Sequence, residues 1–408
     1  MGGAAIAALR LLKAIKKQNI EIKMLVQTKK TDHNFIEQTS NNFFNKQKNF
    51  FYFAYERLLF KLKERDVSVR FAFSMANIGE DISKHQFVKE ADIIHLHWIN
   101  FGFLSINSLQ KLFALGKPIV WTLHDMWAFT GGCHYAYDCK KYQTHCSDCN
   151  YYLKNSKEKD ISYKVFENKI KLFGDVNLNF VTCSNWLGNT AKESKLISKY
   201  NVTPINNAID TNFFKPSDKK ISRQKLNIPS DRKIILFGAM NMSDERKGFK
   251  YLKEALAILE KKPNTDKILI LLFGKSSEEL LKELPFEYHN IKFTNSQEDI
   301  VNIYNSADTY VIPSIQDNLP NTIVESHCCG VPVVGFDTAG ISEMISHKKI
   351  GYLAEYKSSN DLAAGIYWTL FEANSQELSD NSRKYAEENY SEIIVANKYI
   401  NLYKNILN

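Results

Sequence analysis

The sequence contains no run of about 18 apolar residues, the length that a helix needs to cross a lipid bilayer. Its first residues also lack a basic segment followed by a continuous apolar one, which is the pattern of a secretory signal. We therefore expect a cytoplasmic protein whose seven cysteines lie in reducing conditions, where disulfides are rare. The sequence shows neither an internal repeat nor a low-complexity segment.

Positive charge is concentrated in the first half of the chain. Residues 1–199 contain 29 of the 53 Lys and Arg and 18 of the 45 Asp and Glu, a net charge of +11, and the remainder carries −3. This predicts an anionic partner surface, but no nucleic-acid motif accompanies the charge, so we expect no nucleic acid. Within Phe43–Phe73, the run FFNKQKNFFYFAYERLLFKLKER is typical of a helix lying on a membrane face, which predicts a peripheral membrane contact. The alternative is an ordinary amphipathic core helix.

The length of the chain, 408 residues with 44% apolar content, favours two domains with full-sized cores. Helix and strand patterns alternate over most of it, which predicts α/β domains with parallel sheets. Two of the expected strands, ADIIHLHW and KPIVWTLHD, end in histidine.

The segment Pro313–Glu343 reads PSIQDNLPNTIVESHCCGVPVVGFDTAGISE. Asp317 lies in a polar turn after an apolar strand, and Glu325 lies eight positions later in the first turns of a short helix. A strand end, a turn with free amides and a helix N-terminus favour an anion, and a carboxylate one turn into the helix can accept hydrogen bonds from ribose hydroxyls. These residues predict a nucleotide-sugar pocket. The alternative is a turn and a helix with incidental acids.

This segment resembles the Glu-x7-Glu signature of family 4 retaining glycosyltransferases, which have the GT-B fold of two Rossmann-like domains facing a cleft. The flanking PS, CGVPVV and TAGISE also match, and the first acid is Asp317 where the family has Glu. The resemblance implies that Glu325 binds the ribose, and that Asp317 with the backbone of Asn318 and Leu319 holds the donor sugar. It also implies transfer with retention, without a catalytic metal or other catalytic cofactor.

The run INNAIDTNFFKP resembles the linker between the family's two domains. We therefore expect an acceptor-side domain over 1–204, a nucleotide-sugar-binding domain over 205–389, and a last helix over 390–408 that crosses back. Family members begin with a strand ahead of a Gly-Gly loop, but here Gly2 and Gly3 follow Met1 directly, so the first strand is expected to be absent. Small residues there let a diphosphate or an acceptor approach the backbone.

Two cations in FGAMNMSDERKGFKYL, Arg246 and Lys247, precede Gly248 and a helix. They resemble the family's Arg…Lys-Gly element, which holds the donor diphosphate, although the usual earlier Arg is missing and Arg246 is expected to replace it. Fixed cations stabilise the charge that grows on a departing diphosphate. The alternative is an exposed helix start with basic residues.

Histidines at strand ends mark a second candidate region, because ligands of open α/β sheets bind beyond the carboxyl ends of strands. The resemblance implies that His124 contacts the transferring sugar, and His97, Trp98 and Asp125 are candidates for the acceptor side of the cleft. A lone histidine is otherwise more often structural.

The insertion over 130–150 carries a C-x5-C-x6-C-x2-C pattern, which matches the ligand count of a structural zinc site. His134 or His145 could replace one sulfur, and the alternative is unpaired thiols in a Tyr-rich loop. The preceding TLHDMW-x-x-TGGC is similar to bacterial exopolysaccharide glycosyltransferases of the colanic-acid type. The predicted zinc ligands are Cys133, Cys139, Cys146 and Cys149.

Together these resemblances imply a retaining glycosyltransferase of bacterial surface polysaccharide synthesis. Its donor would be a UDP- or GDP-sugar and its acceptor a glycan or lipid-linked glycan, at the inner face of the plasma membrane. The alternatives are a GT-B nucleotide-sugar epimerase, which needs no acceptor, and a degenerate, non-catalytic GT-B homologue.

Overall fold

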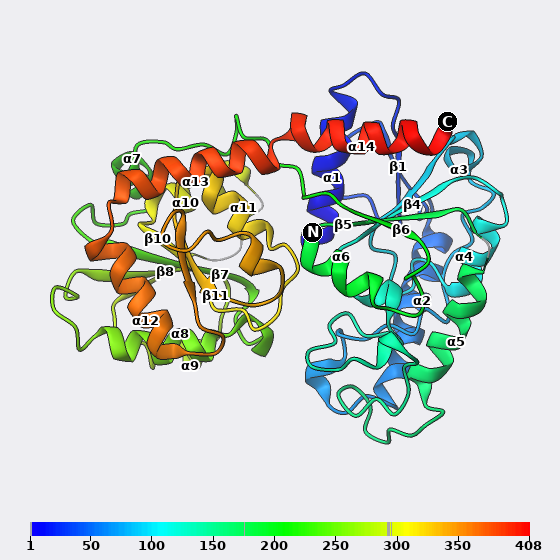
Figure 1. Ribbon diagram of the computed structural model, residues 1–408, viewed down its shortest axis with the longest axis horizontal. Helices are drawn as coiled ribbons and strands as arrows, with labels where there is room; N and C mark the ends of the chain where they lie inside the picture. Colours follow the sequence, from blue (N-terminus) through cyan, green and yellow to red (C-terminus); the bar gives the residue numbers. More distant parts are fainter. Residues whose placement is uncertain (1, 175, 292–293, 295) are drawn as a thin grey trace. The chain divides into compact units, whose positions relative to one another are not determined.

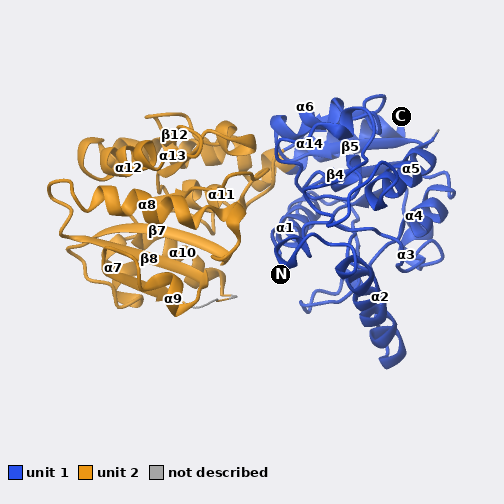
Figure 2. Ribbon diagram, turned by 90° about the horizontal axis from the view of Figure 1, so that it is seen from below, with its two compact units in different colours: residues 1–205, 396–408 blue, residues 206–395 orange. Residues whose placement is uncertain are grey.

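The computed structural model describes residues 2–174, 176–291, 294 and 296–408. The chain folds into two compact units (Figure 1, Figure 2). Unit 1 comprises Met1–Ile205 and Ala396–Asn408, and unit 2 comprises Asn206–Val395. Each unit has its own core of buried apolar side chains.

Unit 1 is an α/β unit whose strands form two parallel sheets. β1 (Met24–Val26) pairs with β2 (Ile36–Gln38), and the second sheet has the order β3-β4-β5-β6. Every residue of β4 (Ile119–Leu123) and β5 (Leu178–Thr182) is buried, as expected for parallel strands covered on both faces. The other elements of unit 1 are α1 (Gly3–Lys16), α2 (Phe43–Lys61), η1 (Val67–Val69), α3 (Gln86–Glu90), β3 (Ile94–Leu96), α4 (Ile106–Phe113), η2 (Trp127–Phe129), η3 (Lys141–Gln143), α5 (Ile161–Phe173), α6 (Asn185–Lys192) and β6 (Asn201–Pro204).

Unit 2 contains one six-stranded parallel sheet of order β12-β11-β10-β7-β8-β9. All residues of β10 (Thr309–Ile312) and β11 (Val333–Phe336) are buried. The predicted α/β class with parallel sheets in two Rossmann-like units is thus confirmed. The remaining elements are α7 (Lys219–Lys225), β7 (Lys233–Asn241), η4 (Glu245–Lys247), α8 (Phe249–Leu259), β8 (Ile268–Lys275), α9 (Glu278–Leu281), β9 (Tyr288–Ile291), α10 (Gln297–Ser306), α11 (Asn321–Cys328), η5 (Ala339–Glu343), β12 (Gly351–Ala354), α12 (Ser359–Tyr367), η6 (Trp368–Glu372), α13 (Ser375–Tyr390) and α14 (Glu392–Leu407), whose residues from Ala396 belong to unit 1.

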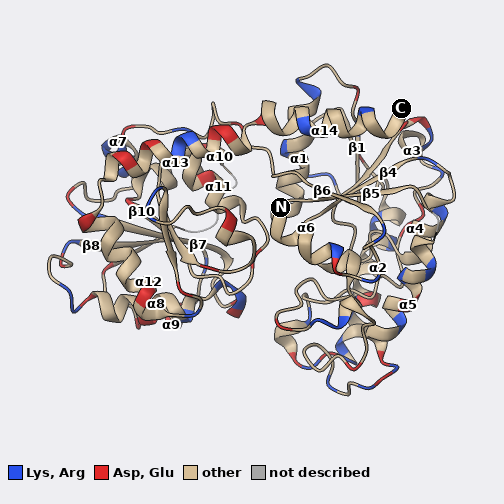
Figure 3. Ribbon diagram, viewed as in Figure 1, with Lys and Arg blue, Asp and Glu red and all other residues tan. Residues whose placement is uncertain are grey.

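The surface of unit 1 combines basic and aromatic residues. Basic residues lie on α5 (Figure 3), and α2 exposes several phenylalanines. Within the part of the chain that the structure describes, no helix combines the length and the apolar character that crossing a membrane requires.

Candidate functional site

Two cations and a carboxylate meet in unit 2 where β7 and β10 end. Arg246 and Lys247 lie in η4 after β7, and Asp317 lies in the loop after β10. Asp317 Oδ2 accepts hydrogen bonds from Lys247 Nζ at 2.6 Å and from Arg246 Nη1 at 3.1 Å. The side chains of Asp317, Arg246 and Lys247 are only 12%, 14% and 23% exposed, so Arg246 and Lys247 are not the fully exposed helix start of the alternative interpretation.

Charge in this cluster is set by the two cations. Burial alone would raise the pKa of Asp317, but Lys247 and Arg246 lower it to about 2. Burial lowers the pKa of Lys247, and the charge of Asp317 opposes that shift. Asp244 adds a more exposed contact, with its Oδ2 3.3 Å from Arg246 Nη2. The cluster therefore carries two fixed, partly buried cations that Asp317 and Asp244 balance in this structure.

Two glycines allow the loops of this cluster to approach closely. Gly248 has φ +69°, and a Cβ there would lie 1.8 Å from Pro313 O. A Cβ on Gly340 would lie 1.5 Å from Asn318 O, and Gly340 N donates to Asp317 O at 3.1 Å. Larger side chains at either position would push η4 or η5 away from the loop after β10.

The loop after β10 is also ordered by its own acid. Asn318 N donates to Asp317 Oδ1 at 3.1 Å, and the next residue, Leu319, is 8% exposed. This geometry holds the backbone of Asn318 beside the carboxylate that pairs with the cations.

Glu325 lies on α11, the short helix that follows this loop, and is 8% exposed. Tyr304 OH, from α10, donates to Glu325 Oε2 at 3.0 Å. Burial first, and the charge of Glu325 second, raise the pKa of Tyr304 well above its usual value, so the hydroxyl remains a donor. Sequence reasoning missed Tyr304, because no local pattern links it to an acid 21 positions later.

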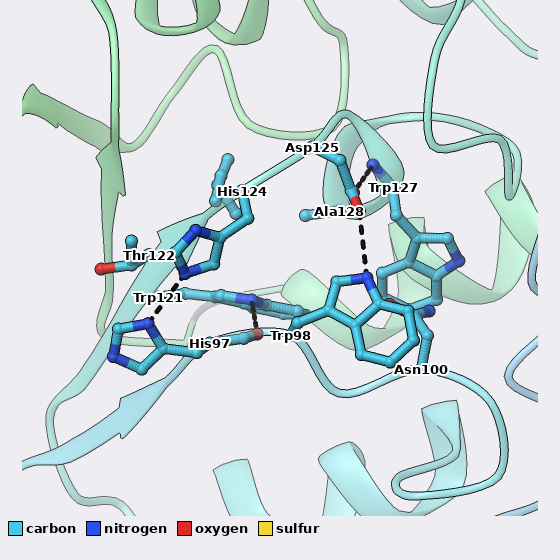
Figure 4. Close-up of a pocket in the computed structure, with 10 residues that line it drawn as sticks. His97, Trp98, Asn100, Trp121, Thr122, His124, Asp125, Trp127 and Ala128 are labelled. Atoms are coloured by element: carbon cyan, nitrogen blue, oxygen red, sulfur yellow. Dashed lines mark hydrogen bonds between the residues drawn. The ribbon is translucent and has the colours of Figure 1, made fainter. Parts of the chain in front are cut away.

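In unit 1, residues of the last part of β4 and residues that follow β3 and β4 line a small pocket (Figure 4). His97 Nδ1 lies 3.0 Å from His124 Nε2, and Trp98 Nε1 donates to Asp125 Oδ2 at 3.1 Å. The structure thus brings together the four residues that the strand ends predicted. The pocket is lined by His97, Trp98, Asn100, Trp121, Thr122, Leu123, His124, Asp125, Trp127 and Ala128.

Burial sets the protonation of the pocket. It lowers the pKa of His124 to about 4 and that of His97 well below its usual value, so both rings are neutral at physiological pH. Burial would raise the pKa of Asp125, but His134, with its Nδ1 2.8 Å from Asp125 Oδ2, lowers it overall. The pocket therefore presents neutral imidazoles beside one charged carboxylate.

A chain of hydrogen-bonded side chains that no sequence motif indicates lies next to the pocket residue Thr122. His95 Nε2 lies 2.8 Å from Thr122 Oγ1, and His95 Nδ1 lies 2.7 Å from Tyr403 OH. Thr122 Oγ1 also lies 3.0 Å from Tyr399 OH. The two tyrosines come from α14, so the C-terminal residues of the chain support the strands that carry the pocket.

Gly2 and Gly3 begin α1. Gly2 is the N-cap residue and is exposed, and a Cβ built there would meet nothing within 4 Å. The space around Gly2 is compatible with the expected close approach of a diphosphate or an acceptor to the backbone there.

The predicted zinc site is not formed by the cysteines of the insertion over 130–150. In residues 2–174, 176–291, 294 and 296–408, no group of three or more His, Cys, Asp or Glu is placed to hold a metal ion. Cys146 Sγ accepts a hydrogen bond from Gly131 N at 3.1 Å, and burial is the main cause that raises the pKa of Cys133 and Cys146 to about 12. Cys146 lies in the core of unit 1, and Cys133, Cys139 and Cys149 pack against it. The correction applies to Cys133, Cys139, Cys146 and Cys149.

Comparison with known families identifies the chain. Residues 1–213 match the model of "Glycosyltransferase Family 4", and residues 218–389 match that of "Glycosyl transferases group 1". The chain belongs to glycosyltransferase family 4. The resemblance seen in the motifs of Pro313–Glu343 is thereby confirmed at the level of the family.

Two curated relatives illustrate this family 4 membership. The chain is 28% identical over 200 residues to the N,N'-diacetylbacillosaminyl-diphospho-undecaprenol alpha-1,3-N-acetylgalactosaminyltransferase of Campylobacter jejuni, covering 48% of this chain and 50% of that protein. It is 24% identical over 336 residues to the putative colanic acid biosynthesis glycosyl transferase WcaC of Escherichia coli, covering 77% of this chain and 76% of that protein. The chain spans about half the length of most of the curated relatives it matches.

Solved structures support the fold of this family 4 chain. Sucrose-phosphate synthase from Thermosynechococcus elongatus aligns with a TM-score of 0.67 and 17% identity, covering 99% of this chain and 94% of that one. Anabaena Alr3699/HepE, solved with UDP-glucose, aligns with a TM-score of 0.64 and 16% identity, covering 99% of this chain and 96% of that one. At such low identity the likeness shows the fold alone, and it confirms the predicted GT-B architecture.

Proposed function

We propose that the protein is a retaining glycosyltransferase that moves a sugar from a nucleotide-diphospho sugar to a glycan or lipid-linked glycan acceptor in bacterial surface polysaccharide synthesis. The observation that carries the proposal is the partly buried cluster of Arg246, Lys247 and Asp317, with Glu325 on the following helix. Family membership supports a transferase, and the names of the relatives support the substrate classes. HepE was solved with UDP-glucose, and the Campylobacter jejuni enzyme is named for an undecaprenol-linked acceptor.

In this proposal, unit 2 binds the donor. Arg246 and Lys247 hold the diphosphate, and Glu325 accepts hydrogen bonds from the ribose hydroxyls while Tyr304 fixes its second oxygen. Asp317 and the backbone of Asn318 and Leu319 hold the donor sugar. The base is that of UDP or GDP.

The transfer step needs no nucleophile from the protein. The acceptor hydroxyl oxygen forms a bond to the anomeric carbon on the face from which the diphosphate leaves. The bond from that carbon to the diphosphate oxygen breaks, and the leaving oxygen takes the acceptor proton. The protein contributes positioning and fixed cations, which stabilise the charge that grows on the diphosphate.

The pocket in unit 1 provides the acceptor side of the proposal. Neutral His124 contacts the transferring sugar, and His97, Trp98 and Asp125 contact the acceptor. Gly2 and Gly3 leave room for a diphosphate or an acceptor at the start of α1. The protein would act in the cytoplasm as a peripheral protein at the inner face of the plasma membrane.

Thermal unfolding in the presence of UDP- and GDP-sugars tests the donor class, because a ligand that binds the folded state raises the melting temperature. The stabilising donor is then incubated with glycan and undecaprenol-linked acceptors, and the anomeric configuration of the product is read by NMR. We expect one donor class to stabilise and the product to retain configuration. Conversion of the donor without an acceptor would indicate the epimerase, inversion would refute retention, and no nucleotide binding by calorimetry would indicate a non-catalytic homologue.

A further inference from the structure

Helix α2 faces solvent with its apolar side. Phe44 is 81% exposed, Phe51 54% and Leu58 58%, whereas the buried residues of α2 are Asn49, Glu56, Arg57 and Phe60. A surface helix of a globular protein normally shows the reverse pattern. Figure 2 shows α2 projecting from the body of unit 1. The core-helix interpretation of this segment is therefore wrong.

A buried ion pair fixes the orientation of α2. Glu56 is fully buried, and its Oε1 accepts hydrogen bonds from Arg57 Nη2 at 3.0 Å and from Ser74 Oγ at 2.6 Å. Arg57 Nη1 also donates to Phe73 O at 2.9 Å. Rotating α2 to bury its phenylalanines would break the hydrogen bonds that join Glu56 to Ser74 and Arg57 to Phe73. The outward apolar face is thus a fixed feature of unit 1.

Five of the exposed apolar residues of α2 and its C-cap lie on one face, and the exposed Phe43 and Phe50 lie beside that face. The spacing of the five, at seven, four, three and four positions, places them on a single helix face. Phe51 and Tyr55 stack with ring centroids 5.5 Å apart. This set of five, called the α2 stripe below, consists of Phe44, Phe51, Tyr55, Leu58 and Leu62.

Positive charge flanks the α2 stripe. The only Asp or Glu between residues 43 and 63 is Glu56, which is buried, so the exposed charges of the segment are all basic. One of them, Lys48, pairs with the buried Glu80 at 3.6 Å. Two copies of this face would bring like charges together, whereas an anionic lipid surface complements both the cations and the apolar stripe. The basic residues are Lys46, Lys48, Lys61 and Lys63.

Aromatic contacts connect this region to the pocket. Phe71, 59% exposed, packs edge-on against Phe101 at 5.9 Å, and Phe101 packs against Trp98 at 4.8 Å. The Arg57 guanidinium lies 4.5 Å from the Phe101 ring centre. A Cβ on Gly102, whose φ is +78°, would lie 2.6 Å from Phe53 N, so glycine lets this loop lie directly on α2.

We propose that the α2 stripe docks on the surface of an anionic lipid bilayer. The stripe enters the interface between headgroups and acyl chains, and the flanking lysines contact anionic headgroups. A second consequence rests on the proposed function: an acceptor that keeps its lipid tail in the bilayer would reach Trp98 and Asp125 along Phe71 and Phe101.

Vesicle co-sedimentation of the full chain tests the docking. The probes are vesicles of phosphatidylcholine and vesicles that also contain phosphatidylglycerol, at low and high salt. We expect binding to the phosphatidylglycerol vesicles that weakens with salt, and a loss of about tenfold or more in the Phe44→Ser, Phe51→Ser double variant. The matched control, Ile221→Ser with Tyr288→Ser, changes residues of unit 2 that are 54% and 41% exposed and should bind as the parent does.

Other outcomes overturn the proposal. Equal vesicle binding by the Phe44→Ser, Phe51→Ser variant and its parent would remove the α2 stripe from the contact. A concentration-dependent mass in light scattering that the same variant abolishes would show a contact between copies instead. Binding is measured without a donor, so a failure of sugar transfer leaves this result readable. Equal melting temperatures and equal near-ultraviolet circular dichroism of variant and parent, measured without ligand, show that the variant is folded.

Discussion

Lys247 Nζ lies 2.6 Å from Asp317 Oδ2, which joins a cation after β7 to an acid after β10. The two residues are 70 positions apart in the sequence. Their contact makes the carboxylate a local counter-charge for cations that are proposed to hold a diphosphate.

Lys247→Ala is expected to weaken UDP or GDP binding about tenfold, because a charge-assisted hydrogen bond to phosphate is lost. Calorimetry with the diphosphate and with the corresponding nucleoside measures the difference, since only the diphosphate should lose affinity. Lys253→Ala, on the exposed side of α8 and paired with Glu283, is the matched control. Equal losses for diphosphate and nucleoside would contradict a phosphate contact.

Glu325→Ala is expected to weaken the binding of both nucleoside and nucleoside diphosphate, because a charged hydrogen bond to the ribose is worth roughly 1.5–3 kcal/mol. Tyr304→Phe removes only the bond to Glu325 Oε2 and should give a smaller loss. The same calorimetric series measures both variants. Unchanged affinity in Glu325→Ala would remove Glu325 from the ribose role.

His124→Ala is expected to lower kcat by about 10²-fold while leaving donor affinity nearly unchanged, because a polar group at the reacting centre acts mainly in the transition state. Turnover, donor affinity and melting temperature are measured on one preparation. A variant with a lower melting temperature and normal turnover per folded molecule would make His124 a structural residue.

Unit 1 is expected to lose stability as the pH falls from about 6.5 toward 4. Burial lowers the pKa of His124 to about 4 and that of His95 to about 3, from a usual 6.5. In that window the unfolded chain binds protons that the folded histidines do not, at about 1.4 kcal/mol per pH unit for each histidine. Asp317 has a pKa lowered to about 2, so its contribution to the stability of the folded protein is lost only when the pH falls below 3.8, the usual pKa of an aspartate. Melting temperature against pH checks the slope, which His95→Gln should reduce; a flat profile would contradict it.

Gly340→Ala is expected to destabilise unit 2 by about 1–3 kcal/mol and to weaken donor binding, since a Cβ there lies 1.5 Å from Asn318 O. Gly238→Ala, also in unit 2, is the control, because no positive φ is needed there and a new Cβ would lie 3.7 Å from Phe273, an ordinary contact. Chemical denaturation measures both variants. Parent-like stability of Gly340→Ala would show that the loop after β10 can move.

Local features of the sequence predicted the α/β class and the positions of several site residues. Alternating helix and strand patterns indicate parallel sheets, and polar residues after apolar strands identify His97, His124 and Asp317. Such signals are readable because they depend on neighbours a few positions away.

Only the tertiary structure decided the contacts between distant segments. Tyr304 on Glu325 and Tyr403 on His95 connect residues 21 and 308 positions apart, a pairing that no local pattern encodes. The cysteine spacing predicted a metal site, but among the described residues no group of three or more possible ligands is placed to hold a metal ion. The aromatic pattern of α2 did not show which side of the helix faces solvent. That side is determined by the buried pair of Glu56 and Arg57.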